Sequence, residues 1–334
     1  MIQRLKQRLK RFVRENNDRK PADLGNHGYE PFTEQTALNA LMAERKSVDL
    51  VSVKDAVLWV YRNDNLYQGL PEEDKNLNLG KLKKISHARP EGPENTALRH
   101  ILSIDPKAAI FDIGCNYGRE AIRMTRTIEA FGASTPVYMF DPGVAGKLAQ
   151  LNMPLNGYHN FKYYNSAIGD VDGHLLVHIV DGQSQDNKII NRSEKATSVP
   201  VKSMRLDSFI RSERISAKAC FIKCDTQGAE LEVLQGLQGN GLYQQSAAVI
   251  EFFPNGLATR IKPALFVTNL CDKFHVYDLG PHRKFFYKIS PEDTGPLFDR
   301  IAKFNPPFTD LLLISKALPG AKDLLARLQQ EHEK

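Results

Sequence analysis

From about residue 96 onward, short apolar runs alternate with stretches of helical periodicity. The first run is AAIFDIG at 108–114 and the last is DLLLISK at 310–316. Strands separated by helices predict an α/β fold, with a mostly parallel sheet and helices on both of its faces. The other expected strands are VYMFDP (137–142), FKYYNSAIGD (161–170), HLLVHIV (174–180), ACFIKCD (219–225), AAVIEFFP (247–254) and FHVYDL (274–279), with helices near 118–131, 144–151 and 228–237.

The residues before this alternation form an N-terminal extension. Residues 1–16 place their apolar side chains on one stripe of a basic amphipathic helix, residues 17–35 are a polar linker rich in Gly and Pro, and residues 36–70 have helical periodicity. We therefore expect three parts: the extension at 1–95, an α/β domain at 96–318 and a C-terminal helical tail at 319–334.

The net charge of +6 arises within the first 20 residues, where eight Lys or Arg accompany only Glu15 and Asp18. The rest of the chain is balanced, which argues against a nucleic-acid groove in its body. The helix at 1–16 either lies on an anionic membrane surface or packs on the protein itself or on a partner copy in a homo-oligomer. Without a spanning run or a secretory signal, we expect a cytoplasmic protein, peripheral to the membrane under the first interpretation.

The cysteines do not indicate a metal site or a disulfide framework. Cys115, Cys220, Cys224 and Cys271 include no Cys-x-x-Cys pair, and no histidines are spaced as zinc ligands. We expect buried, reduced thiols in a protein without a structural metal ion.

The end of the first strand indicates a ligand site. Asp112 ends the strand, and Gly114 and Gly118 then bracket a tight turn that contains Asn116 and leads into a helix. Glycine lets the backbone approach a ligand closely, and the helix N-terminus presents free N–H groups. The spacing differs from the dinucleotide pattern G-x-G-x-x-G and suits a ligand without a pyrophosphate. Asp112 is placed to accept from a cationic amino group; the alternative is a purely structural turn.

The next two strand ends are compatible with a bound nucleoside. The second strand ends at Asp141, where a carboxylate can accept from both hydroxyls of a ribose. The third leads into NSAIGD, in which Ser166, Ala167 or Ile168 could meet an adenine edge. An ordinary turn at this place is the alternative.

Seven ordered motifs resemble the FkbM-type family of S-adenosylmethionine-dependent methyltransferases. They are DIGCNYG, FDP, NSAIGD, VKSMRLDSFI, FIKCDTQGAELEVLQGL, AVIEFFP and TDLLLISK, and they extend over roughly residues 100–317. The resemblance implies a seven-stranded class I methyltransferase sheet, Rossmann-like, whose last strand is antiparallel. It also implies O-methylation, often of a sugar hydroxyl in a glycan or natural product. By the same resemblance, the methionine part of S-adenosylmethionine would lie against Asp112, Gly114, Asn116 and Gly118, and its ribose against Asp141.

Two positions depart from the pattern of that family. Gln227 stands where the family usually has glutamate, so a role for that carboxylate does not carry over. Asp141 stands where glutamate is more frequent, a change that keeps the hydrogen-bond acceptor.

The stretch FIKCDTQGAE (221–230) places charge at the end of a strand that should be buried. With a period of two, Lys223 and Asp225 share one face; Glu230 begins the next helix and Glu251 closes the following strand. These four are the catalytic candidates. Asp225 or Glu251 could be a general base, the two could hold a divalent cation, or Lys223 could simply neutralise a carboxylate.

The leading hypothesis is therefore an S-adenosylmethionine-dependent O-methyltransferase that acts on a hydroxyl of a sugar, a glycan or a small natural product. The alternatives are a non-catalytic, methyltransferase-like binding or scaffold protein and an NAD-dependent oxidoreductase. The oxidoreductase lacks support because neither the third glycine of the dinucleotide pattern nor a Tyr-x-x-x-Lys relay is present. The acceptor, the oligomeric state and the role of residues 1–95 stay open.

Overall fold

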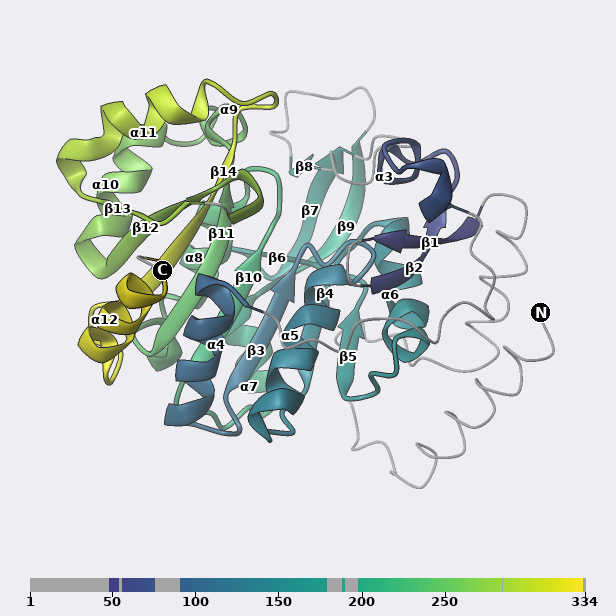
Figure 1. The fold of residues 1–334 in the computed structure, drawn as a ribbon, viewed down its shortest axis with the longest axis horizontal. Coiled ribbons are helices and arrows are strands. Elements are labelled where there is room, and N and C mark those ends of the chain that lie inside the picture. The colour runs from purple at the N-terminus through teal and green to yellow at the C-terminus, as the bar shows by residue number, and fades with distance from the viewer. Residues whose placement is uncertain are drawn as a thin grey trace.

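The described part of this computed structural model comprises residues 48–53, 56–75, 91–178, 188–189, 198–283 and 285–332. It contains an eight-stranded sheet with helices on both faces, a two-stranded hairpin and a four-stranded sheet (Figure 1). The basic helix predicted at 1–16 and the linker predicted at 17–35 lie outside the described residues. Within the described residues, no helix is long and apolar enough to cross a membrane.

The central sheet has five parallel strands followed by an antiparallel one. The pairing order is β5-β4-β3-β10-β11-β14-β12-β13, and β14 is antiparallel to both of its neighbours. The strands are β3 (Ala109–Ile113), β4 (Val137–Phe140), β5 (Phe161–Tyr164), β10 (Cys220–Cys224), β11 (Ser246–Phe252), β12 (Phe274–Gly280), β13 (Tyr287–Ile289) and β14 (Thr309–Ser315). The antiparallel orientation of the last strand confirms the prediction.

The predicted number of seven strands is wrong by one. After β12 the chain turns through a 3-10 helix (η5, Pro281–Arg283) and returns as β13, which pairs with β12 at the edge. The sequence of β13 is only YKI, and two of its three residues are exposed. A strand that is so short and so polar has no alternation that could be read from the sequence.

Adjacent residues of the central strands point to opposite faces, so the sheet has two cores. Ile110 and Phe221 belong to the core under α4 (Pro93–Ile104), α5 (Arg119–Phe131), α6 (Val144–Leu155) and α12 (Ala321–His332). Phe111 and Ile222 belong to the other core. That core is covered by α7 (Leu206–Ser212), α8 (Glu230–Leu237), α10 (Pro263–Lys273) and α11 (Thr294–Ile301), with the short α9 (Pro254–Leu257) beside them. The predicted helices near 118–131, 144–151 and 228–237 are confirmed as α5, α6 and α8.

A second, four-stranded sheet follows β5 in the chain. Its order is β6-β9-β7-β8, from β6 (Ala167–Gly169), β9 (Ser198–Arg205), β7 (Gly173–His178) and β8 (Lys188–Ile189). Helix α8 packs against β6 and β9. The four cysteines are buried and free of disulfides, as predicted.

The helical segment predicted within 36–70 is wrong where the structure describes it. Residues Val48–Val53 (β1) and Ala56–Tyr61 (β2) form an antiparallel hairpin, followed by one turn of helix, α3 (Asn65–Gln68), and a 3-10 turn, η1 (Glu72–Asp74). The strand sequences VDLVSV and AVLWVY are rich in valine, which favours strands, and nearly all of their residues are buried. Short apolar runs buried on both sides carry no periodicity that separates strand from helix.

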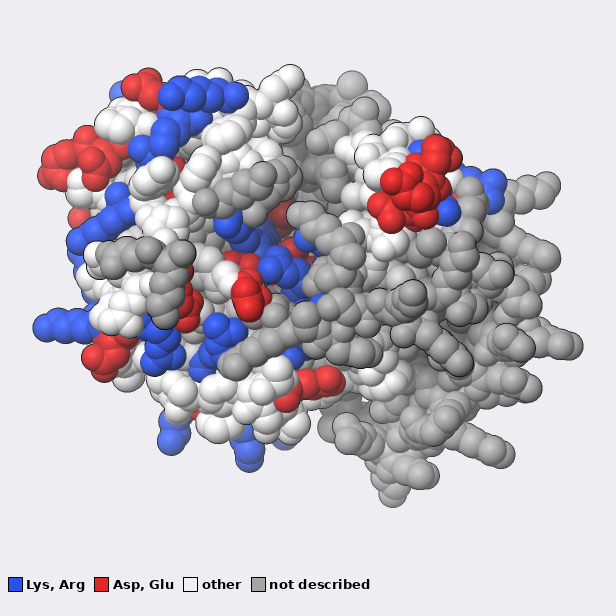
Figure 2. All heavy atoms as spheres, viewed as in Figure 1, with Lys and Arg blue, Asp and Glu red and all other residues white. Residues whose placement is uncertain are grey.

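Charges of both signs are interspersed over the described part of one face of the molecule. Figure 2 shows acidic and basic side chains scattered among neutral ones on the described part of the face seen. This distribution agrees with the charge balance of the sequence after residue 20.

Gly236 of α8 is a position where the fold depends on a missing side chain. A Cβ there would overlap the carbonyl oxygen of Gly169 in β6 and lie 3.3 Å from the backbone nitrogen of Leu206. We expect Gly236→Ala to lower the free energy of unfolding by about 2 kcal/mol, because backbone atoms cannot move aside and this overlap outweighs the better helix propensity of alanine. Urea unfolding of the wild type and the variant measures this difference in the free energy of unfolding. Gly241→Ala, where a Cβ meets nothing within 4 Å, is the matched control; equal effects would contradict the prediction.

Candidate functional site

Two loops meet at the carboxyl edge of the sheet, one after β3 and one after β10. The backbone N–H of Asp225 donates to the carbonyl of Ile113 (2.9 Å), and the N–H of Gly114 donates to Phe140 (2.8 Å). Gly114 has φ 75°, and a Cβ on it would overlap the carbonyl oxygen of Asp225. Glycine is therefore required at 114 because the second loop is so close, which is a different reason from the approach of a ligand.

Asp141 holds the first loop in shape. Its Oδ2 accepts from the backbone N–H of Asn116 (2.8 Å) and its Oδ1 from that of Gly143 (2.6 Å). Asn116 has φ 47°, a left-handed conformation that costs energy in a residue other than glycine. Burial raises the pKa of Asp141, and the two N–H groups partly offset that rise. At the end of the loop, Gly118 has φ 83° and precedes α5.

Asp112 is buried at the base of this loop with an unsatisfied oxygen. The residue is 1% exposed, and its Oδ2 has no hydrogen-bond partner within the described part of the chain. Burial, helped by the nearby charge of Glu120, raises the pKa of Asp112 to about 8. A buried carboxyl in this state is stabilised by a cation that binds next to it.

The end of β5 supplies a second buried group without a partner. Ser166 is fully buried, and within the described residues its Oγ forms no hydrogen bond. Ala167 and Ile168 follow in β6 and are 8% and 1% exposed. These three residues therefore follow β5 in the chain, which is where the sequence analysis had placed them.

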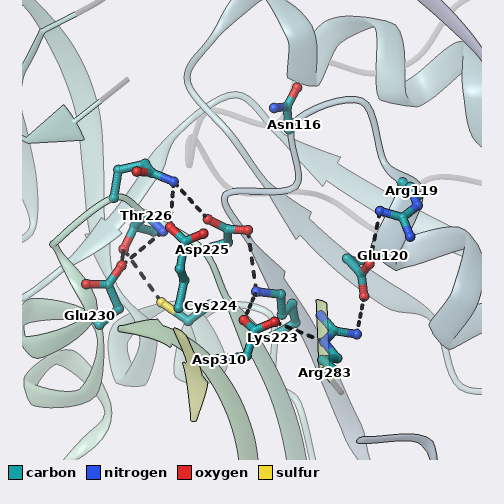
Figure 3. Close-up of polar contacts among 12 residues, drawn as sticks. Asn116, Arg119, Glu120, Lys223, Cys224, Asp225, Thr226, Glu230, Arg283 and Asp310 are labelled. Carbon is teal, nitrogen blue, oxygen red and sulfur yellow. Dashed lines mark hydrogen bonds and ion pairs between the residues drawn. The ribbon is translucent and has the colours of Figure 1, made fainter. Parts of the chain in front are cut away.

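Lys223 is buried at the carboxyl end of β10 among carboxylates. Its Nζ lies 3.4 Å from Oδ2 of Asp225 and 3.6 Å from Oδ1 of Asp310 (Figure 3). Burial alone would lower the pKa of Lys223, but Asp225 and Asp310 outweigh burial and raise it. Lys223 is therefore a permanent cation. Of its two carboxylate partners, Asp225 is the one that faces the solvent: its side chain is 37% exposed, against 11% for Asp310.

Gln227 connects the two candidate bases. Its Nε2 donates to Oε2 of Glu251 (2.5 Å) and to Oδ1 of Asp225 (3.4 Å). Burial and then the charge of Asp225 raise the pKa of Glu251 well above its usual range. The environments of the two carboxyls therefore differ: Asp225 lies 3.4 Å from the cation of Lys223, whereas burial and the charge of Asp225 disfavour the ionised form of Glu251. A glutamate at 227 would be an acceptor unless it carried a proton itself.

Glu230 has a different task from the other three catalytic candidates. Its Oε1 accepts from the backbone N–H and the hydroxyl of Thr226 (3.2 and 3.0 Å) and from the N–H of Gly228 (3.0 Å). Burial raises its pKa to about 7. Among the described residues it has no hydrogen bond or ion pair with Lys223, Asp225 or Glu251. Lys223, Asp225 and Glu251 therefore lie together, whereas Glu230 stabilises the turn between β10 and α8.

Arg283, Asp310 and Glu120 belong to this site, and the sequence reasoning missed them. Arg283 Nη1 lies 2.8 Å from Glu120 and its Nε lies 3.2 Å from Asp310 (Figure 3). Nη1 also lies 3.3 Å from Glu94. A signal existed for Asp310: an antiparallel last strand begins at the edge where parallel strands end, and Asp310 stands opposite Glu251. Arg283 follows β12 in a 3-10 turn and has no comparable signal.

Backbone strain gathers at the same place. Among the described residues, four other than glycine have positive φ: Asn116, Gln227, Arg283 and Arg214. The first three lie in the loops of this site. Strained backbone persists where its surroundings hold it, and such positions cluster at functional sites.

The comparison with known families is decisive for the class of protein. The model of the methyltransferase FkbM domain matches residues 85–288, more than half of the chain. The chain belongs to the FkbM methyltransferase family. The match confirms the resemblance noted in the motifs, and it makes the protein a methyltransferase by family. The hairpin β1–β2 lies outside the matched residues.

Three solved structures are distantly similar to this FkbM-family chain. A precorrin-6y C5,15-methyltransferase from Geobacter metallireducens is 9% identical, with 66% of this chain and 86% of that chain covered and a TM-score of 0.33. A SAM-dependent O-methyltransferase from Thermotoga maritima is 11% identical, with 80% and 92% covered and a TM-score of 0.31. A putative class I S-adenosylmethionine-dependent methyltransferase from Listeria monocytogenes is 12% identical, with 94% and 88% covered and a TM-score of 0.33. No curated protein matches the chain.

The raised pKa of Asp112 predicts how the stability of the ligand-free protein depends on pH. In the unfolded chain this carboxyl loses its proton near its usual pKa of 3.8, whereas in the folded protein it keeps the proton up to about pH 8. The folded state binds more protons between these values, so this group makes the protein less stable as pH rises from 4 to 8.

Asp112→Asn removes that dependence. We expect the variant to gain stability on the wild type between pH 4 and 8, by a total on the order of a few kcal/mol. Urea unfolding at a series of pH values measures the difference, and the shared contribution of Glu230 cancels. Asp272→Asn, at an exposed position in α10, controls for the loss of one charge. Parallel stability curves for wild type and Asp112→Asn would sink the prediction.

Proposed function

We propose that this protein is an S-adenosylmethionine-dependent O-methyltransferase that acts on a hydroxyl of a sugar, in a glycan or a small natural product. The observation that carries the proposal is the buried carboxyl of Asp112, whose Oδ2 has no partner in the described residues. It lies beside the loop that contains Gly114 and Gly118. The α-ammonium group of S-adenosylmethionine would satisfy this oxygen.

The other cofactor candidates fit the same ligand. Both oxygens of Asp141 already accept a backbone N–H, but each has a second lone pair that can accept from a ribose hydroxyl. The unpartnered hydroxyl of Ser166 can serve an adenine edge. When bound, S-adenosylmethionine supplies a methyl group already activated by its sulfonium.

Proton removal from the acceptor falls to Asp225. Of the two candidate bases it is the exposed one, and its Oδ2 lies 3.4 Å from Nζ of Lys223. Glu251 is only 9% exposed, so an acceptor hydroxyl reaches it less easily and it is the weaker candidate for the base. The hydroxyl proton would move to an oxygen of Asp225, and Gln227, which donates to Oδ1, would hold that carboxylate in position. Asp225 and Glu251 remain the pair that could bind a divalent cation in an alternative mechanism.

The first test is cofactor binding, measured by calorimetry with S-adenosylmethionine and, as a negative control, with NAD. We expect the wild type to bind only the former. Asp112→Asn should weaken binding about 10- to 100-fold, because a hydrogen bond between charged groups is lost. Asp272→Asn should bind like the wild type. Unchanged affinity in Asp112→Asn would refute the cofactor site, and binding of NAD alone would refute the reaction class.

The second test concerns turnover. Glycans and metabolites from cells that lack the protein are incubated with it and with S-adenosylmethionine labelled in the methyl group, and mass spectrometry locates the label. We expect a methylated sugar hydroxyl, and we expect Asp225→Asn to reduce the rate about 100-fold or more with cofactor affinity nearly unchanged. Label on nitrogen or carbon would contradict O-methylation. If a chelator abolished turnover, the mechanism with a general base would be wrong, and the mechanism with a bound divalent cation would take its place.

A further inference from the structure

The hairpin β1–β2 packs against helix α6 through β2 (Figure 1). Two asparagine side chains, Asn152 in α6 and Asn156 at its C-terminal cap, hydrogen-bond to the backbone of β2 as a neighbouring strand would. Asn156 accepts from the N–H of Val57 (3.0 Å) and donates to its carbonyl (2.7 Å). Asn152 accepts from the N–H of Trp59 (2.7 Å) and donates to its carbonyl (3.3 Å). The geometry fits because residues i and i+4 of a helix are about 6 Å apart along its axis, close to the repeat of two residues in a strand.

Only one of these asparagines also reaches the glycine loop. The side-chain nitrogen of Asn152 donates to the carbonyl of Tyr117 (2.9 Å), which lies between Asn116 and Gly118. Asn152 is fully buried, so its hydrogen bonds do not compete with water. The aromatic rings of Tyr61, at the end of β2, and Tyr117 are also neighbours, with centroids 6.4 Å apart. Asn156 instead donates its remaining hydrogen bond to the carbonyl of Asn152 within the helix (2.8 Å).

We propose that the β1–β2 hairpin is a working part of the cofactor site, with Asn152 as the positioning residue that connects it to the loop 114–118. This inference rests on the proposed function, because it assumes that the loop binds S-adenosylmethionine. It goes beyond the family assignment, since the hairpin precedes the matched residues 85–288. It gives the part of the extension around Trp59 a task within the site.

The physical reason lies in the strained conformation of the loop. Asn116, with φ 47°, points its N–H at Asp141, and this conformation needs support from both sides. Asp141 supports the loop through the backbone nitrogen of Asn116, and Asn152 supports it one residue later through the carbonyl of Tyr117. Without the second support the loop would populate other conformations, and the apparent affinity for a ligand falls in proportion to the fraction of competent loop.

The two asparagines provide a matched pair of variants in the full-length chain. Asn152→Leu and Asn156→Leu each replace an amide by an apolar side chain of similar size, and each removes both hydrogen bonds to the hairpin. We expect both to lower the midpoint of urea unfolding by similar amounts. Calorimetry with S-adenosylhomocysteine should show about 10-fold weaker binding for Asn152→Leu and a change of no more than about 2-fold for Asn156→Leu. Equal affinities in the two variants, or equal losses, would overturn the proposal.

Hydrogen exchange of the backbone amides in loop 114–118 provides a readout that does not need a ligand. Exchange should be faster in Asn152→Leu than in Asn156→Leu. That result would support the role of Asn152 in holding the loop even if the wild type bound no S-adenosylhomocysteine. That failure of wild-type binding would count against the proposed function alone. If Asn152→Leu does not fold, Asn152→Ser, which also cannot reach Tyr117, takes its place in both measurements. Equal exchange in the two variants would refute the role of Asn152.

Discussion

The burial of Lys223 is the constraint around which the site is built. Lys223 is 4% exposed, and a buried ammonium group is costly unless carboxylates compensate it; Asp225 does so from the loop after β10 and Asp310 from β14. Asp310 is shared with Arg283, which in turn is compensated by Glu120 from the first turn of α5. One buried cation thereby connects the end of β10, the start of β14 and the helix after the glycine loop. Any change of charge at one member is felt by the others.

Close packing of backbone is the second element that couples binding to chemistry. Gly114 touches the carbonyl of Asp225, and the N–H of Asp225 is bound to Ile113. The loop assigned to the cofactor and the residue assigned to proton removal therefore cannot move independently. In a methyl transfer, donor and acceptor must be held close and in line, so a fixed distance between these two loops is what the reaction requires.

Local patterns in the sequence were sufficient for seven of the eight strands of the central sheet, all except β13, and for the strand-end residues, because both depend on periodicity and on the topology of parallel strands. Asp112, Asp141, Asp225 and Glu251 could be placed at one edge for that reason. The hairpin β1–β2 could not be recognised, since its strands are stabilised by Asn152 and Asn156, which lie about ninety residues later in the chain. The position of Arg283 likewise depends on distant partners. The roles of the individual site residues remain predictions.

Gln227 has the most informative environment among the departures from the family pattern. An amide that donates to two carboxyls allows them to lie close together without a third negative charge. The amide adds no charge beside two carboxyls in different environments: Asp225 lies 3.4 Å from Lys223, and burial together with the charge of Asp225 raises the pKa of Glu251. With glutamate in its place, three carboxyls would share the protons or attract a cation. Under the proposed function, the glutamine therefore fits Asp225 better than Glu251 as the general base.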